Sequence, residues 1–277
     1  MLSIIISSYQ EHYYQNLEKN IQETCGIEYE IIKVYNPGIM GICEAYNIGR
    51  KKAKYQNLLF IHEDTEFETK NWGILLLEEL NQPTCGIVGV AGSRYLPNVP
   101  IGWWELNTET VRNYTQYDQG QFYRYELDEF AKVEVLDGVF LAIKSAVFDK
   151  YFFNELLQGF HAYDIDLSYR VSQDYINYVT NKIMIRHFSN GSTNQEWFSA
   201  MHKFSELRRT YTQSNRQILS KHEGYALFVL YKYLLSFPQK QKSMIFKYFN
   251  FKYLRITGFL TFFKFYLKSK LKVSLKN

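Results

Sequence analysis

Short apolar segments alternate with helix-like segments through residues 2–91, and no other feature of the sequence constrains the fold as strongly. The apolar segments are residues 2–9, 29–35, 57–62 and 86–91. The segments with Leu or Ile at helical spacing are residues 11–25, 42–54 and 72–81. Strands and helices in alternation are typical of a mostly parallel sheet flanked by helices. The sequence therefore predicts an α/β fold.

The following part of the chain is less regular. Residues 92–131 have no clear periodicity, and a loop of this length in a compact domain is usually a lid or a functional insertion. Residues 133–143 are expected to form a strand that breaks at Gly138, and residues 176–187 a strand or a hairpin. Helices are expected at residues 145–157, 164–173 and 197–218.

Charge divides the chain into two parts. Residues 221–277 contain 12 Lys and Arg residues and a single acid, Glu223, whereas residues 1–220 contain 20 basic and 27 acidic residues. The net charges of +11 and −7 indicate an acidic domain (residues 1–220) followed by a basic, aromatic, helical tail (residues 221–277). Pro238 is expected to separate two helices of this tail.

An apolar stripe in the tail has two interpretations. Ile256, Phe259, Leu260 and Phe263 follow helical spacing. The stripe either packs on the acidic domain or lies on a membrane surface, and the excess of lysine favours the membrane. Nucleic acid is disfavoured as a partner because the acidic domain would repel it.

Cysteine usage and the absence of targeting signals bear on the compartment. Cys25, Cys43 and Cys85 are odd in number and have no Cys-x-x-Cys spacing, which indicates a reducing environment and neither a disulfide framework nor a zinc site. No segment resembles a signal peptide or reaches the roughly 18 apolar residues of a membrane span. We expect a cytoplasmic protein, or one held peripherally on the inner face of the cell membrane.

Two acidic clusters carry the chemistry. His62, Glu63 and Asp64 end the third apolar segment, and Asp164 and Asp166 follow 100 residues later. Ligands bind at the carboxyl ends of strands in open α/β sheets, so the first cluster is placed to hold a divalent cation and, through it, a diphosphate. The second cluster supplies a carboxylate for proton abstraction. These groups are the minimum equipment for glycosyl transfer from a nucleotide sugar.

Four segments carry a family resemblance, namely residues 3–9, 45–49, 60–64 and 160–167. In this order and spacing they resemble the family 2 glycosyltransferases of GT-A fold, over residues 2–200. More narrowly, the chain resembles a bacterial subgroup that has His-Glu-Asp in place of the usual Asp-x-Asp. The resemblance implies a Rossmann-like, mostly parallel sheet flanked by helices, and the basic tail lies outside it.

The resemblance implies a donor-binding site at the ends of the first strands. Ser7, Ser8 and Tyr9 match positions that contact the nucleobase and the ribose. Asn36 stands where the family usually has an Asp that reads the base, which leaves the identity of the base open. Asn47 matches an Asn beside the diphosphate.

The metal motif of the family falls on the first acidic cluster. Asp64 matches the last position of Asp-x-Asp, His62 replaces the first Asp, and His187 matches a late His that serves as a further ligand. His62 and Glu63 are also implied donor contacts, with ordinary strand-end residues as the alternative. Imidazole suits Mn²⁺ better than Mg²⁺, so Mn²⁺ is the favoured cofactor.

The second cluster supplies the implied catalytic base. Asp164 aligns with the base of inverting family members, and Tyr163 replaces the Glu that usually precedes it. Asp164 would deprotonate the acceptor hydroxyl as its oxygen attacks the anomeric carbon. It could also serve as the N-cap of the following helix. Asp137 and Gly138 match the segment beneath the donor sugar, where a glycine would let the sugar approach the backbone.

Acceptor contacts are assigned with less support from motifs. His161, Asp166, Trp103 and Trp104 are the candidates, and Trp197 is a further residue that could stack on a sugar. The alternative for each Trp is core packing. The alternative for Asp166 is to cap the helix or to orient its neighbours.

The sequence thus predicts a metal-dependent, inverting glycosyltransferase that moves a sugar from a nucleoside-diphosphate donor, with UDP favoured. The acceptor would be a glycan or lipid-linked glycan in bacterial surface polysaccharide synthesis. The alternative is a catalytically impaired GT-A-like scaffold that binds a nucleotide sugar or another transferase. A nucleotidyltransferase is disfavoured because the N-terminal region has no Gly-rich phosphate loop followed by Lys. The sugar, base, acceptor, linkage and oligomeric state are left open.

Overall fold

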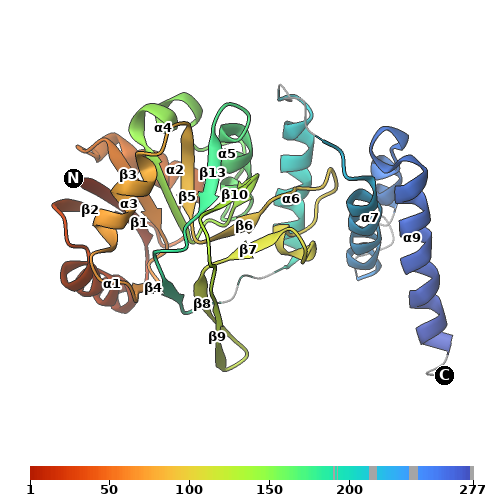
Figure 1. Cartoon of the computed structure of the whole chain (residues 1–277), viewed down its shortest axis with the longest axis horizontal. Coiled ribbons are helices and arrows are strands. Elements are labelled where there is room, and N and C mark those ends of the chain that lie inside the picture. Colours follow the sequence, from red (N-terminus) through yellow and green to blue (C-terminus); the bar gives the residue numbers. More distant parts are fainter. Residues whose placement is uncertain (190, 192, 212–216, 237–242, 275–277) are drawn as a thin grey trace.

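The computed structural model describes the chain except for residues 190, 192, 212–216, 237–242 and 275–277. A seven-stranded sheet of order β10-β13-β5-β12-β3-β1-β2 lies at its centre (Figure 1). β2, β1, β3, β5 and β13 run in one direction, and β12 and β10 run in the opposite one. The predicted α/β fold with a mostly parallel sheet is confirmed. The strand bounds are β1 (Leu2–Ser8), β2 (Tyr29–Tyr35), β3 (Asn57–Ile61), β5 (Cys85–Gly89), β10 (Ala131–Val133), β12 (Phe140–Lys144) and β13 (Ile176–Val179).

Helices flank this sheet because each presents an apolar face to it. α1 buries Tyr14, Leu17, Ile21 and Thr24, which recur at helical spacing. α2 lies directly on the first strand, where a Cβ atom on Gly49 would come within 2.3 Å of the Ile5 side chain. The helices that flank the sheet are α1 (Glu11–Thr24), α2 (Ile42–Lys52), α3 (Trp72–Leu80), α4 (Ser145–Tyr151) and α5 (Tyr163–Val171).

Two smaller sheets extend the domain, with orders β11-β6-β7 and β4-β14-β8-β9. We interpreted the segment 92–131 as a long loop. That interpretation is wrong for residues 110–125, which lie mostly in the short strands of these sheets, whereas residues 94–109 contain only a short 3-10 turn. The hairpin considered for residues 176–187 is also wrong, because β13 and β14 belong to different sheets. Strands this short show no periodicity in sequence, and tertiary pairing defines them. Their bounds are β4 (Thr65–Phe67), β6 (Ala91–Ser93), β7 (Thr110–Arg112), β8 (Tyr114–Asp118), β9 (Gln121–Tyr125), β11 (Val135–Leu136) and β14 (Ile185–His187), with a 3-10 turn η1 (Trp103–Glu105).

Two predicted helices end early. The helix expected at residues 145–157 is α4, which stops at Tyr151, and the following Phe152 has a positive φ of 25°. The helix expected at residues 197–218 is α6 (Gln195–Arg208), whose side-chain cap is Asn194. Part of the expected helix, residues 212–216, lies outside the described residues.

The described residues of the basic tail form α7 (Ser220–Leu235), η2 (Ser243–Tyr248) and α9 (Phe251–Ser274). Figure 1 shows α7 and α9 beyond α6, at the end of the molecule opposite the N-terminal strands. α7 and α9 pack closely, since a Cβ atom on Gly224 would lie 2.0 Å from the Gly258 carbonyl oxygen. α9 has a break at Arg255, where φ is 47°. Pro238, the predicted helix separator, lies outside the described residues.

The two faces of the tail have different surroundings. α7 is attached to the domain through the buried Glu223, which accepts hydrogen bonds from the Tyr95 hydroxyl and the Asn98 backbone. α9 instead exposes large apolar side chains at Ile256, Leu260, Phe263, Leu267 and Leu271. Packing on the domain therefore accounts for α7. In the predicted stripe of α9, Ile256, Leu260 and Phe263 are exposed, whereas Phe259 packs against Phe249 and Phe251. Within the described residues, no helix is long and apolar enough to cross a membrane.

Candidate active site

A pocket of about 480 Å³ opens at the carboxyl end of β3, between the central sheet and the small strands. Its lining combines residues from both predicted clusters with residues from η1 and β7–β9. The predicted residues that line it are His62, Trp103, Trp104, Asp137, Gly138, His161, Asp164, His187 and Trp197.

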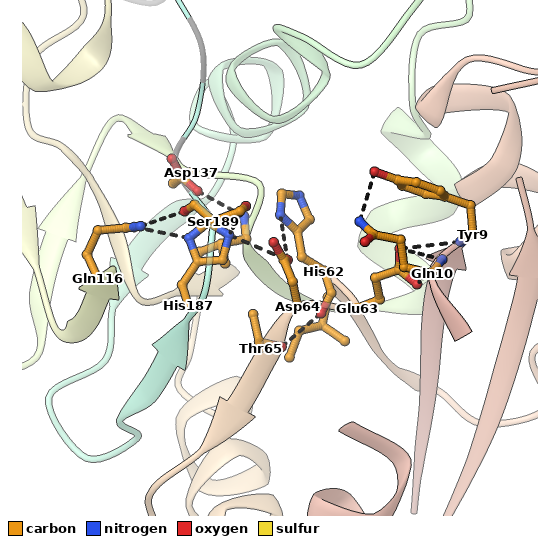
Figure 2. Close-up of polar contacts among 12 residues, drawn as sticks. Tyr9, Gln10, His62, Glu63, Asp64, Thr65, Gln116, Asp137, His187 and Ser189 are labelled. Carbon is orange, nitrogen blue, oxygen red and sulfur yellow. Dashed lines mark hydrogen bonds and ion pairs between the residues drawn. The ribbon is translucent and has the colours of Figure 1, made fainter. Parts of the chain in front are cut away.

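Three predicted metal ligands converge beside this pocket. The closest side-chain atoms of His62, Asp64 and His187 all lie within 4.8 Å of one another. Asp64 Oδ1 is 3.5 Å from His187 Nε2 and 4.0 Å from His62 Nδ1 (Figure 2). The backbone explains the convergence, since β14 pairs antiparallel with β4 and sets His187 opposite Thr65. We call these three residues the metal-binding edge.

The donor set fits a divalent transition metal. Two imidazole nitrogens and one carboxylate oxygen face one another, and imidazole suits Mn²⁺ and similar ions better than Mg²⁺. Burial by itself would raise the pKa of Asp64, but hydrogen bonds and charges from His187 and His62 lower it below its usual range. Asp64 is therefore held as a carboxylate, the form that binds a cation.

Neighbouring side chains orient both imidazoles. His187 Nδ1 is 3.0 Å from Gln116 Oε1, and His62 Nε2 is 2.8 Å from the Tyr163 hydroxyl. In each ring the other nitrogen faces Asp64. A partner at one nitrogen sets the tautomer and the direction of the other, which is how metal-binding histidines are commonly held.

Glu63 faces away from the metal-binding edge. Its carboxylate accepts the backbone N–H groups of Tyr9 and Gln10 at 3.2–3.3 Å, and it is buried (Figure 2). Glu63 thus shapes the turn between β1 and α1, where the nucleotide is expected. Its direct contact with the donor remains a prediction.

Asp164 lies in the first turn of α5 and lines the pocket. Its Oδ2 accepts the Gly138 N–H at 2.8 Å. Burial, together with the charge of Asp137, raises the pKa of Asp164 to about 7. The alternative of a helix N-cap is wrong, because Ala162 with φ of 64° occupies that position. A carboxyl group with this pKa can exchange a proton near neutral pH.

Gly138 is explained by a protein neighbour. A Cβ atom at this position would lie 2.1 Å from the Tyr163 hydroxyl oxygen. The space that we expected a sugar to use is therefore filled by Tyr163, the same side chain that holds His62. Asp137 beside it accepts the indole N–H of Trp103 at 3.1 Å.

The predicted base-binding residues lie at the ends of adjacent parallel strands. Ser7 and Ser8 end β1, Tyr9 follows with 61% of its surface exposed, and Asn36 follows β2. The Asn36 amide is buried and bonds to the backbone N–H and carbonyl of Met40 and to the Ser7 hydroxyl. Exposure therefore favours Tyr9 over Asn36 as the contact for a base.

A family model described as "Glycosyltransferase like family" matches residues 3–223. The chain belongs to this family. The predicted resemblance to glycosyltransferases is thus confirmed, and with it, at the level of the family, the prediction of a transferase. The narrower subgroup with His-Glu-Asp remains a prediction. No curated protein matches the sequence.

Solved glycosyltransferases share the fold of this family member. S. aureus TarS 1-349 in complex with UDP aligns with a TM-score of 0.57 and 11% identity, covering 87% of this chain and 76% of that one. GalNAc-T7 with UDP, GalNAc and Mn²⁺ aligns with a TM-score of 0.55 and 12% identity, covering 90% of this chain and 54% of that one. The chain thus spans about half of the GalNAc-T7 chain. Identities this low show the GT-A fold alone.

Asn47 and Asp166, two of the predicted site residues that do not line the pocket, bond within this glycosyltransferase-like chain. Asn47 uses its amide on the Phe153 backbone and the Glu155 carboxylate. Asp166 is fully buried and pairs with Arg170 at 2.7 Å and with the Tyr211 hydroxyl. Asp166 therefore orients its neighbours, which was the alternative to acceptor contact.

The opposite wall of the pocket contains residues that the sequence did not single out. Trp104 packs against Trp197, with ring centroids 5.8 Å apart, so these two predicted residues share a cluster. Beside them, β7–β9 add Arg112, Tyr123 and Tyr125. No motif marks these positions, nor that of Gln116, because only the tertiary structure brings them to the site. Tyr163 lies in a motif segment, but its contact with His62 could not be read from the sequence. We call Trp103, Trp104, Arg112, Tyr123 and Tyr125 the aromatic wall.

Proposed function

We propose that this protein transfers a sugar from a nucleoside-diphosphate sugar, with UDP favoured, to a hydroxyl of a glycan or lipid-linked glycan. The observation that carries the proposal is the convergence of His62, Asp64 and His187 beside a pocket that also contains Asp164. UDP in the TarS and GalNAc-T7 structures, and Mn²⁺ in the latter, support the choice of donor and metal.

The chain's own residues account for the proton transfer. Asp164, with a pKa of about 7, accepts the proton of the acceptor hydroxyl as its oxygen bonds to the anomeric carbon and the bond to the diphosphate breaks. The Gly138 N–H stabilises the ionised carboxylate, whereas Asp137 opposes ionisation. Attack opposite the leaving group inverts the anomeric centre. A divalent cation held by His62, Asp64 and His187 would supply positive charge to the leaving diphosphate.

The tail supports a lipid-linked acceptor in bacterial surface polysaccharide synthesis, with the protein peripheral on the inner face of the cell membrane. The exposed stripe of α9, from Ile256 to Leu271, lies among Lys264, Lys268 and Lys270 and has no acidic neighbour in the tail after Glu223. Apolar side chains with flanking lysines bind anionic lipid surfaces by burial and charge together.

Vesicle sedimentation tests the tail. We expect Leu260→Ser to weaken binding to phosphatidylglycerol vesicles, by about 2 kcal/mol or less for one leucine. Leu156→Ser is the matched control, since both leucines are 65% exposed and Leu156 lies in the domain. Equal vesicle binding by both variants contradicts a membrane-bound α9.

The scaffold alternative rests on three departures from the family pattern, at His62, at Tyr163 and at Tyr46, where family members often have Arg. His62 and Tyr163 are integrated in the site, because His62 Nε2 meets the Tyr163 hydroxyl at 2.8 Å and Gly138 leaves room for that hydroxyl. Such mutual adaptation favours a working site over a decayed one.

Calorimetric titration with UDP tests the donor site. We expect UDP to bind in the presence of Mn²⁺ and Asp64→Ala to weaken binding by more than about tenfold. Asp128→Ala is the matched control, since it removes the same charge from an exposed position outside the pocket. If UDP, GDP, CMP and dTDP all fail to bind with Mn²⁺ or Mg²⁺, the scaffold alternative is the better account.

A further inference from the structure

Arg112 is a half-buried cation that has no counter-ion among the residues that the structure describes. It ends β7 and lines the active-site pocket. Across the described residues its side chain forms no hydrogen bond or ion pair, and its Nε is buried without a partner. Its neighbours are two rings, with the guanidinium carbon 5.6 Å from the Trp103 centroid and 4.9 Å from the Tyr125 centroid.

Other arginines of the domain are paired differently. Arg50 pairs with Asp149, Arg170 with Asp166, and Arg186 with Glu68. Removing a guanidinium from water is costly unless charged or hydrogen-bonding partners replace the water. Aromatic faces return only part of that cost. An anionic group of a ligand would supply the charged partner that no described residue provides to the Arg112 guanidinium.

The position of Arg112 relative to Asp137 and Asp164 indicates which part of the substrate Arg112 contacts. Trp103, on which Arg112 packs, donates its indole N–H to Asp137, and the adjacent Gly138 donates to Asp164. Arg112 thus lies on the aromatic side of the base, away from the β1 and β2 ends where the nucleotide is expected. A group bound there belongs to a sugar near the reacting hydroxyl.

Charge in the pocket also singles out Arg112. Asp118, Asp137 and Asp164 line the pocket, and Arg112 is the one Lys or Arg among its described lining residues. A guanidinium presents paired N–H donors that match a carboxylate or a phosphate. Arg112 is therefore the group in this pocket suited to an anionic sugar.

We propose that Arg112 binds the acid group of an anionic sugar, a carboxylate or a phosphate, and so makes the enzyme selective for an acidic glycan substrate. This inference rests on the proposed function. The acid group belongs to the acceptor or to the transferred sugar, and the aromatic rings beside Arg112 are positioned to contact the same sugar.

Two sets of acidic and neutral sugar probes distinguish an acid group on the acceptor from one on the transferred sugar. The acceptor arm compares methyl glucuronide and glucose 6-phosphate with neutral methyl glucoside, using full-length protein saturated with UDP and Mn²⁺. The donor arm compares UDP-glucuronic acid with UDP-glucose. The variants are Arg112→Gln, Arg112→Lys and the control Arg94→Gln, since Arg94 is exposed and does not line this pocket.

We expect wild type to prefer the acidic probe about tenfold or more in one arm, as charged hydrogen bonds provide. Arg112→Gln should abolish the preference, Arg112→Lys should retain part of it, and Arg94→Gln all of it, with UDP affinity and melting temperature unchanged. Equal binding of acidic and neutral probes by wild type, or an equal loss for both in Arg112→Gln, would overturn the proposal.

Failure of the proposed function gives a different result, because UDP itself then fails to bind. In that case the sugar probes are compared without nucleotide. A preference for acidic probes that depends on Arg112 supports the anion site, and its absence overturns it.

Discussion

The metal-binding edge and the aromatic wall face the same pocket but arise from the sequence in different ways. His62 and Asp64 directly follow a buried strand, and His187 ends a strand that pairs beside them. The aromatic wall comes from η1 and β7–β9, short elements within residues 92–131. The predicted metal ligands thus lie at strand ends, and the residues that we propose to recognise a sugar lie on short elements outside the central sheet.

The comparison of the two regions predicts that a substitution at Asp164, the proposed base, lowers kcat without changing the affinity for the donor. Asp164→Asn leaves the pocket shape intact and removes the proton acceptor. We expect kcat to fall by about 10²–10⁴-fold. Calorimetry with UDP and Mn²⁺ should give wild-type affinity. A kcat within about tenfold of wild type would remove Asp164 from the role of base.

The next largest effect is expected in the pH dependence of kcat/KM. Because the pKa of Asp164 is raised to about 7, kcat/KM at saturating Mn²⁺ should rise about tenfold per pH unit below 7 and level off above it. The same shift predicts that the free energy of unfolding decreases as pH rises from about 4 to 7, since the folded state holds a proton that the unfolded chain releases. Thermal unfolding of wild type and Asp164→Asn measures this, and the variant should lack that contribution.

Removing the hydrogen-bond partners of His62 and His187 tests whether these partners strengthen binding of the metal. Gln116→Ala and Tyr163→Phe each delete one hydrogen bond to a metal-binding histidine. We expect each to weaken Mn²⁺ binding by about 10–100-fold. Gln173→Ala is the control, since Gln173 is half-buried, donates a hydrogen bond to the Tyr169 carbonyl and does not line the pocket. Unchanged Mn²⁺ affinity in both variants would contradict the orienting role.

The smallest effect is expected at the aromatic wall. Trp104→Ala removes a ring that packs on Trp197 in the pocket. We expect KM for the acceptor to rise by about threefold to tenfold, and kcat and UDP affinity to stay near wild type. Initial rates at varied acceptor concentration measure this. A loss of UDP affinity instead would show that the wall belongs to the donor site.

Agreement between sequence and structure differs from element to element. Residues 29–35 were predicted as a strand and form β2 over the same span, because a short run rich in β-branched and aromatic residues that ends at a turn is a local signal. The prediction of a loop at residues 92–131 was wrong because the strands there have no such local signal. Each strand there has three to five residues and exists because β11, β14 or a neighbouring strand supplies its hydrogen bonds.

Asp164 and Asp166 show the same difference between what the sequence indicates and what the tertiary structure decides. Both belong to one cluster in sequence, two positions apart, and both were predicted to be functional. The turn of α5 directs Asp164 into the pocket and Asp166 into the core beside Arg170. Two positions along a helix differ by about 200° in direction, so sequence proximity cannot show which carboxylate faces a ligand.

The sequence by itself determined the α/β class, the family and the residues from which the metal-binding edge is built, because apolar periodicity and strand-end motifs are local. The tertiary structure alone decided that Tyr163 fills the space above Gly138 and that Gln116 holds His187. It also decided that Arg112 lies in the pocket without a counter-ion from the described part of the chain. These arrangements depend on contacts between distant segments, since packing and electrostatic environment arise only when those segments meet.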